Sequence, residues 1–254
     1  MRALIIGLLL SSMGLPIPSA QSATLVLRSK PQHLHLYGPE NGPAVLLSSG
    51  DLGWAGLVAH VAELLADKGY FVVGVDTRAY LSSFTGGTSS LSPQDVKSDY
   101  RVLVQFCRKR AVPLPILVGI SEGAGLSVLA ASAPDARRYI RGILGFGLPN
   151  ENELGWKWRD FTIWLTKKVP NEPIFKVEDF IAQVSPIPLA EIHSLHDEFV
   201  SIDQARLLFS IAAIPKRMWV IDAANHRFSN KREELDRRTI EALEWIQQNS
   251  QAGQ

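Results

Sequence analysis

Short apolar runs alternate with segments in which apolar residues recur at helical spacing along most of the chain. The runs have strand length, and most are followed by Gly, Asp or Ser, as is typical of buried parallel strands. We expect strands at residues 24–27, 33–36, 44–47, 71–75, 116–118, 140–144, 190–193 and 217–221. The segments between them predict helices at 56–68, 93–110, 122–133, 202–211 and 233–247. This alternation predicts an α/β fold with a mostly parallel central sheet flanked by helices.

Two segments interrupt the alternation. Residues 82–92 are rich in Gly, Ser and Thr and predict a flexible loop at the carboxyl end of the sheet, where open α/β folds bind ligands. Residues 148–189 include the string WKWRDFTIWL and several prolines, and they predict a helical, cap-like insertion. Its Trp156, Trp158 and Trp164 suit a packed core as well as a pocket.

The first 22 residues have the layout of a secretory signal peptide. Arg2 precedes an apolar run at residues 3–10, and a Pro/Ser-rich stretch follows that ends in small residues. The run is too short to span a bilayer, so we expect cleavage after Ser22 rather than an anchor. The mature chain is then one domain, residues 23–254, in a periplasmic or secreted protein.

Composition narrows the classes of partner. The 254 residues include 26 basic and 25 acidic side chains, a net charge of +1, so no electrostatic signal points to nucleic acid or an anionic membrane surface. The single cysteine, Cys107, cannot form an internal disulfide and is expected to pack in a helix. Neither a cofactor nor a metal is predicted, and the oligomeric state is left open.

The string Gly119-Ile120-Ser121-Glu122-Gly123 lies between the predicted strand at 116–118 and the following helix. Such a G-x-S-x-G string at a strand-to-helix turn is typical of a nucleophile elbow, where the serine backbone is strained and bulkier neighbours would collide. With 19 glycines in the chain, the string alone can arise by chance. Its position makes Ser121 the candidate nucleophile and Gly119 and Gly123 the elbow glycines.

A serine nucleophile needs a histidine base and a carboxylate that orients it, and in this fold they follow in the order Ser, acid, His, each after a strand. His226 follows the last predicted strand and is the candidate base. The remaining histidines lie in early strands or a helix, or come before the acid: His33, His35, His60, His193 and His196. Asp197 is the preferred acid. Asp222 competes, only four residues before His226, and so does Asp203, inside a predicted helix.

The developing oxyanion needs two backbone N–H donors. One is the residue after the nucleophile, Glu122, and the other is expected from the loop after an early strand, at Asp51. An acidic side chain beside a developing negative charge is unfavourable. We therefore expect both carboxylates to point away from the oxyanion, into structural pairings rather than toward a cationic substrate group.

Several strings resemble the VirJ/AcvB family of bacterial periplasmic α/β-hydrolases: SSGDLGW, GYFVVGVDTRAYL, the elbow GISEGAG and the late NHRF. The resemblance runs from about Ala44 to the end, and the S-G-D-x-G-W loop is its most specific part. It implies a periplasmic enzyme related to hydrolases of lysyl-phosphatidylglycerol. By position, Ser121 would be its nucleophile, His226 its base, Asp197 its acid and Asp51 part of its oxyanion loop. The chain departs from the family pattern at S-E-G-A-G and at the unpaired histidine of Asn225-His226.

These features predict a serine hydrolase that cleaves a carboxylic ester through an acyl-enzyme. The substrate would be a small-molecule or lipid ester, such as an aminoacyl ester of phosphatidylglycerol, with peripheral membrane contact through that substrate. The alternative is a non-catalytic binding or secretion-accessory protein on a hydrolase scaffold, because a fold does not fix a function. A peptidase also remains open.

Overall fold

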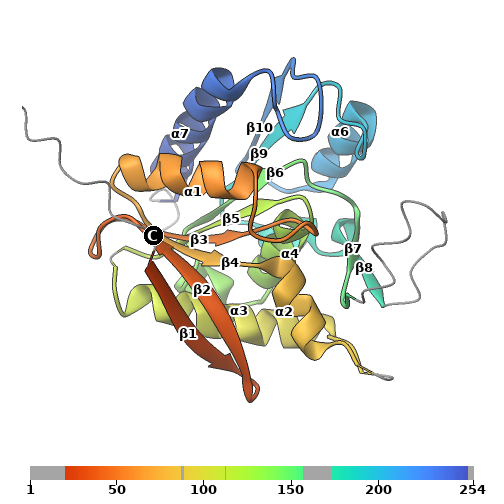
Figure 1. Cartoon of the computed structure of the whole chain (residues 1–254). Coiled ribbons are helices and arrows are strands. Elements are labelled where there is room, and N and C mark those ends of the chain that lie inside the picture. Colours follow the sequence, from red (N-terminus) through yellow and green to blue (C-terminus); the bar gives the residue numbers. More distant parts are fainter. Residues whose placement is uncertain (1–20, 87–88, 112, 157–172, 251–254) are drawn as a thin grey trace, which may run out of the picture.

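The computed structural model describes residues 21–86, 89–111, 113–156 and 173–250 (Figure 1). An eight-stranded sheet forms its centre, in the order β1-β2-β4-β3-β5-β6-β9-β10. The strands are β1 (Gln21–Leu27), β2 (Lys30–Tyr37), β3 (Ala44–Ser48), β4 (Phe71–Val75), β5 (Ile116–Ile120), β6 (Gly142–Phe146), β9 (Leu189–Ser194) and β10 (Lys216–Ile221). β1 and β2 form an antiparallel hairpin on β4, and all pairings from β4 to β10 are parallel.

The five adjacent strands β4, β3, β5, β6 and β9 are buried along their whole length, which explains their nearly continuous apolar sequences. Helices cover both faces of the sheet: α1 (Leu57–Asp67), α2 (Thr77–Phe84), α3 (Pro93–Arg108), α4 (Glu122–Ala131), α6 (Ile202–Ile211) and α7 (Arg232–Asn249). In Figure 1, α1 and α7 lie on one face, and α3 and α4 lie on the other. Each face has its own cluster of buried apolar side chains. The predicted α/β architecture is confirmed.

Local sequence signals set several helix starts. Ser92 accepts a hydrogen bond from the Asp95 N–H, and the Asp95 carboxylate accepts one from the Ser92 N–H, a capping box with Pro93 at the first helical position. Ser201 and Gln204 form the same arrangement at α6. Cys107 is fully buried in α3, where burial raises the pKa of its thiol to about 12.

Three expectations about segments differ from the structure. Residues 82–84, predicted as loop, complete α2, whose start is capped by the Asp76 carboxylate. The sixth strand is shifted by two residues, from the expected 140–144 to Gly142–Phe146. In the described part of the insertion there is no α-helix. It contains the antiparallel ribbon of β7 (Glu151–Glu153) and β8 (Ile174–Lys176), then the 3-10 turns η3 (Val177–Asp179) and η4 (Ile181–Val184).

Some predictions lie outside the described residues. Trp158 and Trp164 are not among the described residues. Trp156 is described, and its backbone N–H donates to the Thr85 hydroxyl. Of the predicted signal peptide, only Gln21 and Ser22 are described, and they begin β1, so cleavage after Ser22 stays a prediction. None of the described helices combines the length and apolar character that a membrane span requires.

Candidate active site

Ser121 stands between β5 and α4 with a φ of 51° and a ψ of −116°. A positive φ is strained for a residue with a side chain, and such strain gathers at functional turns. The turn has no room for side chains on either flank. A Cβ at Gly119 would lie 2.3 Å from the Gly123 carbonyl oxygen, and one at Gly123 would lie 2.4 Å from the Ser48 carbonyl oxygen. The G-x-S-x-G spacing is therefore required by the packing of β5, α4 and the end of β3.

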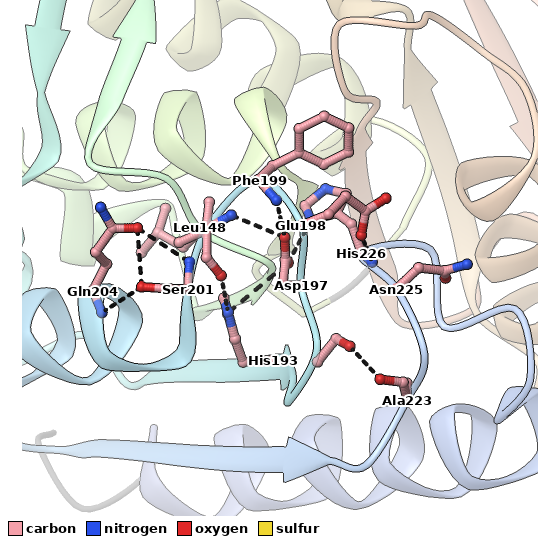
Figure 2. A network of polar contacts seen from close by, with 12 residues as sticks. Leu148, His193, Asp197, Glu198, Phe199, Ser201, Gln204, Ala223, Asn225 and His226 are labelled. Atoms are coloured by element: carbon pink, nitrogen blue, oxygen red, sulfur yellow. Dashed lines mark hydrogen bonds and ion pairs between the residues drawn. The ribbon is translucent and has the colours of Figure 1, made fainter.

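The Asp197 and His226 side chains are joined directly, although they belong to different loops (Figure 2). His226 Nδ1 lies 2.6 Å from Asp197 Oδ2, and the Asp197 side chain is fully buried. Asp197 Oδ1 accepts the N–H groups of Phe199 and Val200, each at 2.9 Å. Burial alone would raise the pKa of Asp197, but the bonds from His226, Val200 and Phe199 outweigh it and hold the pKa below its usual value. Asp197 is therefore an ionised acceptor for the His226 ring.

The two competing acids lie elsewhere. Asp222 Oδ1 pairs with His196 Nε2 at 3.1 Å, and the two side chains are 73% and 62% exposed. Asp203 is in the first turn of α6, and its side chain is 92% exposed. The carboxylate bonded to the His226 ring is that of Asp197, not that of Asp222 or Asp203.

Ser121 and His226 both contact the end of β6. The Ser121 N–H donates to the Phe146 carbonyl at 2.8 Å. At the next residue, Gly147, a Cβ would lie 2.5 Å from His226 Cε1, so only glycine leaves space for the imidazole. The structure brings Ser121 and His226 to the same strand end, but it shows no hydrogen bond between the Ser121 hydroxyl and the His226 ring.

The loop with the predicted second oxyanion donor passes beside the nucleophile. A Cβ at Gly50 would lie 3.5 Å from Ser121 Cβ, and Asp51 follows with an exposed side chain. Farther along, Trp54 fixes the loop on β4. A Cβ at Gly74 would lie 2.0 Å from the indole, and the backbone N–H of Trp54 donates to Asp76 Oδ2 at 3.2 Å. The strings S-G-D-L-G-W and V-V-G-V-D thus form one interlocked unit.

Glu122 supplies the other predicted N–H as the first residue of α4, where backbone N–H groups have no acceptor within the helix. Its carboxylate accepts the Glu153 N–H at 2.5 Å and so ties the elbow to β7 of the insertion. Burial, and then the nearby negative charge of Glu153, raises the pKa of Glu122 well above its usual value. The side chain serves a structural contact, as the sequence led us to expect.

Glu191 and His193 were not among the predicted site residues, and both are buried beside the acid loop, the segment 195–201 that carries Asp197. Glu191 Oε1 accepts the Leu148 N–H at 2.9 Å and lies 3.4 Å from His193 Nδ1. His193 Nε2 lies 2.9 Å from the Val200 carbonyl and 3.8 Å from Asp197 Oδ2 (Figure 2). The signal in the sequence was a Glu and a His two positions apart in an otherwise apolar strand.

A cavity of about 490 Å³ adjoins this site. The Phe199 ring forms one wall and meets the His226 ring edge-on, with centroids 5.4 Å apart. Apart from Phe199, the lining combines apolar and polar side chains: Leu148, Pro149, Val200, Leu207, Leu208, Ile211, Asn150, Glu151, Glu178 and Gln204. Within the described residues, no cluster of three or more His, Cys, Asp or Glu side chains is arranged to hold a metal ion.

The fold is similar to that of several solved structures of esterases and α/β hydrolases. Est1E from Butyrivibrio proteoclasticus is 16% identical, with a TM-score of 0.65 over 89% of this chain and 98% of that one. The esterase Pf2001 from Pyrococcus furiosus is 16% identical, with a TM-score of 0.65 over 89% of each chain. The α/β hydrolase GrgF from Penicillium sp. sh18 is 11% identical, with a TM-score of 0.67 over 92% of this chain and 99% of that one.

No curated protein matches the chain in sequence. A family model does match, over residues 43–168, and its description is "Bacterial virulence protein (VirJ)". The matched part contains the interlocked loop of Trp54, the elbow at Ser121 and the start of the insertion. On this match and the fold, the chain belongs to the VirJ family of bacterial virulence proteins and has the α/β-hydrolase architecture.

Proposed function

We propose that the protein is a serine hydrolase of carboxylic esters, with Ser121 as nucleophile, His226 as base and Asp197 as acid. The observation that carries the proposal is the buried 2.6 Å contact between Asp197 and His226 beside Gly147, one residue beyond the carbonyl that accepts the Ser121 N–H. A histidine held by a buried carboxylate next to a strained serine elbow is the arrangement that acyl transfer requires.

In the first half of the proposed reaction, His226 Nε2 takes the proton of the Ser121 hydroxyl as the oxygen attacks the ester carbonyl carbon. The electron pair of the carbonyl bond moves to its oxygen, and the N–H groups of Glu122 and Asp51 donate to this oxyanion. When the carbonyl re-forms, the bond to the alcohol oxygen breaks. The leaving alcohol takes the proton from His226 and leaves an acyl group on Ser121.

The second half repeats these steps with water. His226 removes a proton from the water as the water oxygen attacks the acyl carbon. When the tetrahedral adduct collapses, the bond from the acyl carbon to Ser121 Oγ breaks, His226 gives its proton to Ser121 Oγ, and the carboxylic acid departs. Asp197 keeps its negative charge throughout, so that it fixes the Nδ1–H tautomer of His226 and stabilises the imidazolium that forms twice.

For the substrate, we propose an ester with an apolar portion that enters the cavity beside Phe199. The apolar side chains of the lining and the contact of the Phe199 ring with the His226 ring support this choice. Glu151 and Glu178 in the lining, together with Asp51 near the elbow, favour a cationic group on the same molecule. An aminoacyl ester of phosphatidylglycerol combines both features. Such a substrate agrees with the predicted export to the periplasm or beyond.

The direct test is turnover of a short p-nitrophenyl ester by the purified protein and by Ser121→Ala. The wild type should hydrolyse the ester, and the variant should lose at least about a thousandfold in kcat while unfolding at the same temperature. Equal activity in the variant would overturn the assignment. For the finer proposal, lysyl-phosphatidylglycerol in mixed micelles should be cleaved faster than the same ester with both amino groups acetylated. Equal rates for the two esters would contradict the cationic preference.

A further inference from the structure

Glu191 and His193 form a buried polar pair directly beneath the acid loop. Both belong to β9, both point to the same face of the strand, and their exposed fractions are 1% and 0%. The neighbouring strand leaves room for them, because a Cβ at Gly145 would lie 2.4 Å from Glu191 Oε2. Burying a carboxylate and an imidazole is costly unless they are paired, so this placement needs a physical reason.

Proton counting gives the state of the pair. The Val200 carbonyl can only accept, so the 2.9 Å contact requires a hydrogen on His193 Nε2. At Nδ1, 3.4 Å from Glu191 Oε1, one further proton must lie on either the ring or the carboxyl group. The Leu148 N–H donates to the same oxygen, and the Asp197 carboxylate lies 3.8 Å from His193 Nε2. Both contacts favour an imidazolium facing a carboxylate.

The charges around the pair are few among the described residues. On β9 and its following loop, Glu191 and Asp197 face His193. β6 contributes Gly145, and the segment after it contributes the Leu148 N–H. In β10 the register partner of His193 is the apolar Val220. α6 also packs on β9, but its charged side chains, Asp203 and Arg206, are 92% and 59% exposed. Around the base, Asp197 faces the His226 ring, and Glu198 accepts the His226 backbone N–H.

We infer that Glu191 and His193 are positioning residues that act on His226 through Asp197. His193 donates to the Val200 carbonyl, and the backbone N–H of Val200 donates to Asp197 Oδ1. The Glu191–His193 pair thus closes the turn that aims Asp197 Oδ2 at His226. The positive charge of His193 partly offsets the negative charge of Asp197. Asp197 therefore stabilises the protonated His226 ring less strongly, and His226 gives up its proton more readily. This inference deepens the proposed function and rests on its assignment of acid and base.

The first experiment is a histidine NMR titration, which needs no turnover. In the wild type, both ring nitrogens of His193 should carry protons from pH 5 to pH 8. In Glu191→Gln, the amide keeps the shape of the side chain and an acceptor for the Leu148 N–H, but it cannot hold the counter-charge. His193 should become neutral at pH 8, and the His226 midpoint should rise by about one unit.

A neutral His193 in the wild type at pH 7 would overturn the inference, and this reading requires no variant to fold. A His226 midpoint that is the same in Glu191→Gln and in the wild type would overturn it too. His196→Gln is the matched control, because His196 lies next to Asp197 in the chain but pairs at the surface with Asp222, which follows β10. It should leave the His193 and His226 titrations unchanged.

Kinetics supply a readout that a purely structural role would not change. In Glu191→Gln, the acidic limb of kcat/KM should move up by about one pH unit, which is about a tenfold loss well below the limb. The plateau should stay within about threefold of the wild type, because the triad side chains are intact. A lower plateau with an unmoved limb would contradict the inference. Activity in Ser121→Ala would instead reject the proposed hydrolase, while the NMR titration would still decide the state of the pair.

Discussion

The choice of Asp197 as the acid gives the sharpest prediction. In Asp197→Asn, the amide oxygen can still accept the N–H groups of Phe199 and Val200, which now go to Oδ1. The amide NH₂ then faces His226 Nδ1, where the carboxylate oxygen stood at 2.6 Å. Since both would be donors, the ring must turn to the tautomer with its hydrogen on Nε2 and cannot take the proton of Ser121.

The expected loss in kcat is about 10³- to 10⁴-fold, which corresponds to about 4–5.5 kcal/mol of transition-state stabilisation. The cost to folding should be smaller, about 1.5–3 kcal/mol, because one charge-assisted hydrogen bond is lost and the two backbone donors keep an acceptor. Ester turnover at saturating substrate measures the first quantity. Denaturant unfolding of the same preparations measures the second.

Asp222→Asn is the matched control, since Asp222 also pairs with a histidine but is 73% exposed. An exposed pair of this kind contributes at most about 1 kcal/mol to stability, and kcat should remain within about threefold of the wild type. Full activity in Asp197→Asn together with a large loss in Asp222→Asn would refute the assignment of the acid.

Two further changes test the surroundings of the elbow. Gly74→Ala puts a methyl group where the Trp54 indole lies, so the free energy of unfolding should fall by about 1–3 kcal/mol and kcat should fall with it. Normal stability together with a normal kcat would show that the interlocked loop does not need this contact. Glu122→Gln keeps an acceptor for the Glu153 N–H but removes a carboxyl group whose pKa is raised by burial and by Glu153. The folded wild type favours the protonated carboxyl group, so it loses stability as pH rises above the pKa of the unfolded chain. The stability of the variant relative to the wild type should therefore increase between pH 4.5 and pH 7.5, and thermal unfolding at the two values would reveal a constant difference if the reasoning is wrong.

The sequence was informative where local pattern and burial coincide. β5, which leads into the elbow, and its sheet neighbour β3 are wholly buried, so their apolar runs could be recognised without knowledge of the surrounding elements. The order of Ser121, Asp197 and His226 along the chain could also be predicted, because parallel strands bring the loops that follow them to one edge. The structure places these three residues at that edge, each after a different strand.

Other features depend on contacts between distant segments. Glu191 is accommodated only because Gly145, on the next strand, has no side chain, and neither residue indicates this by itself. The indole of Trp54 similarly requires Gly74. Residues 82–84 have the composition of a loop, but the cap at Asp76 and the burial of Tyr80 and Leu81 extend α2 through them.

The central claim is that Ser121 is a nucleophile activated by His226. A fluorophosphonate probe added to the wild-type protein should form one covalent adduct, and peptide mass spectrometry should place it on Ser121. The His226→Gln variant should label far more slowly, and Ser121→Ala should not label at all. An unlabelled wild-type protein, or an adduct on another residue that persists in Ser121→Ala, would contradict the claim.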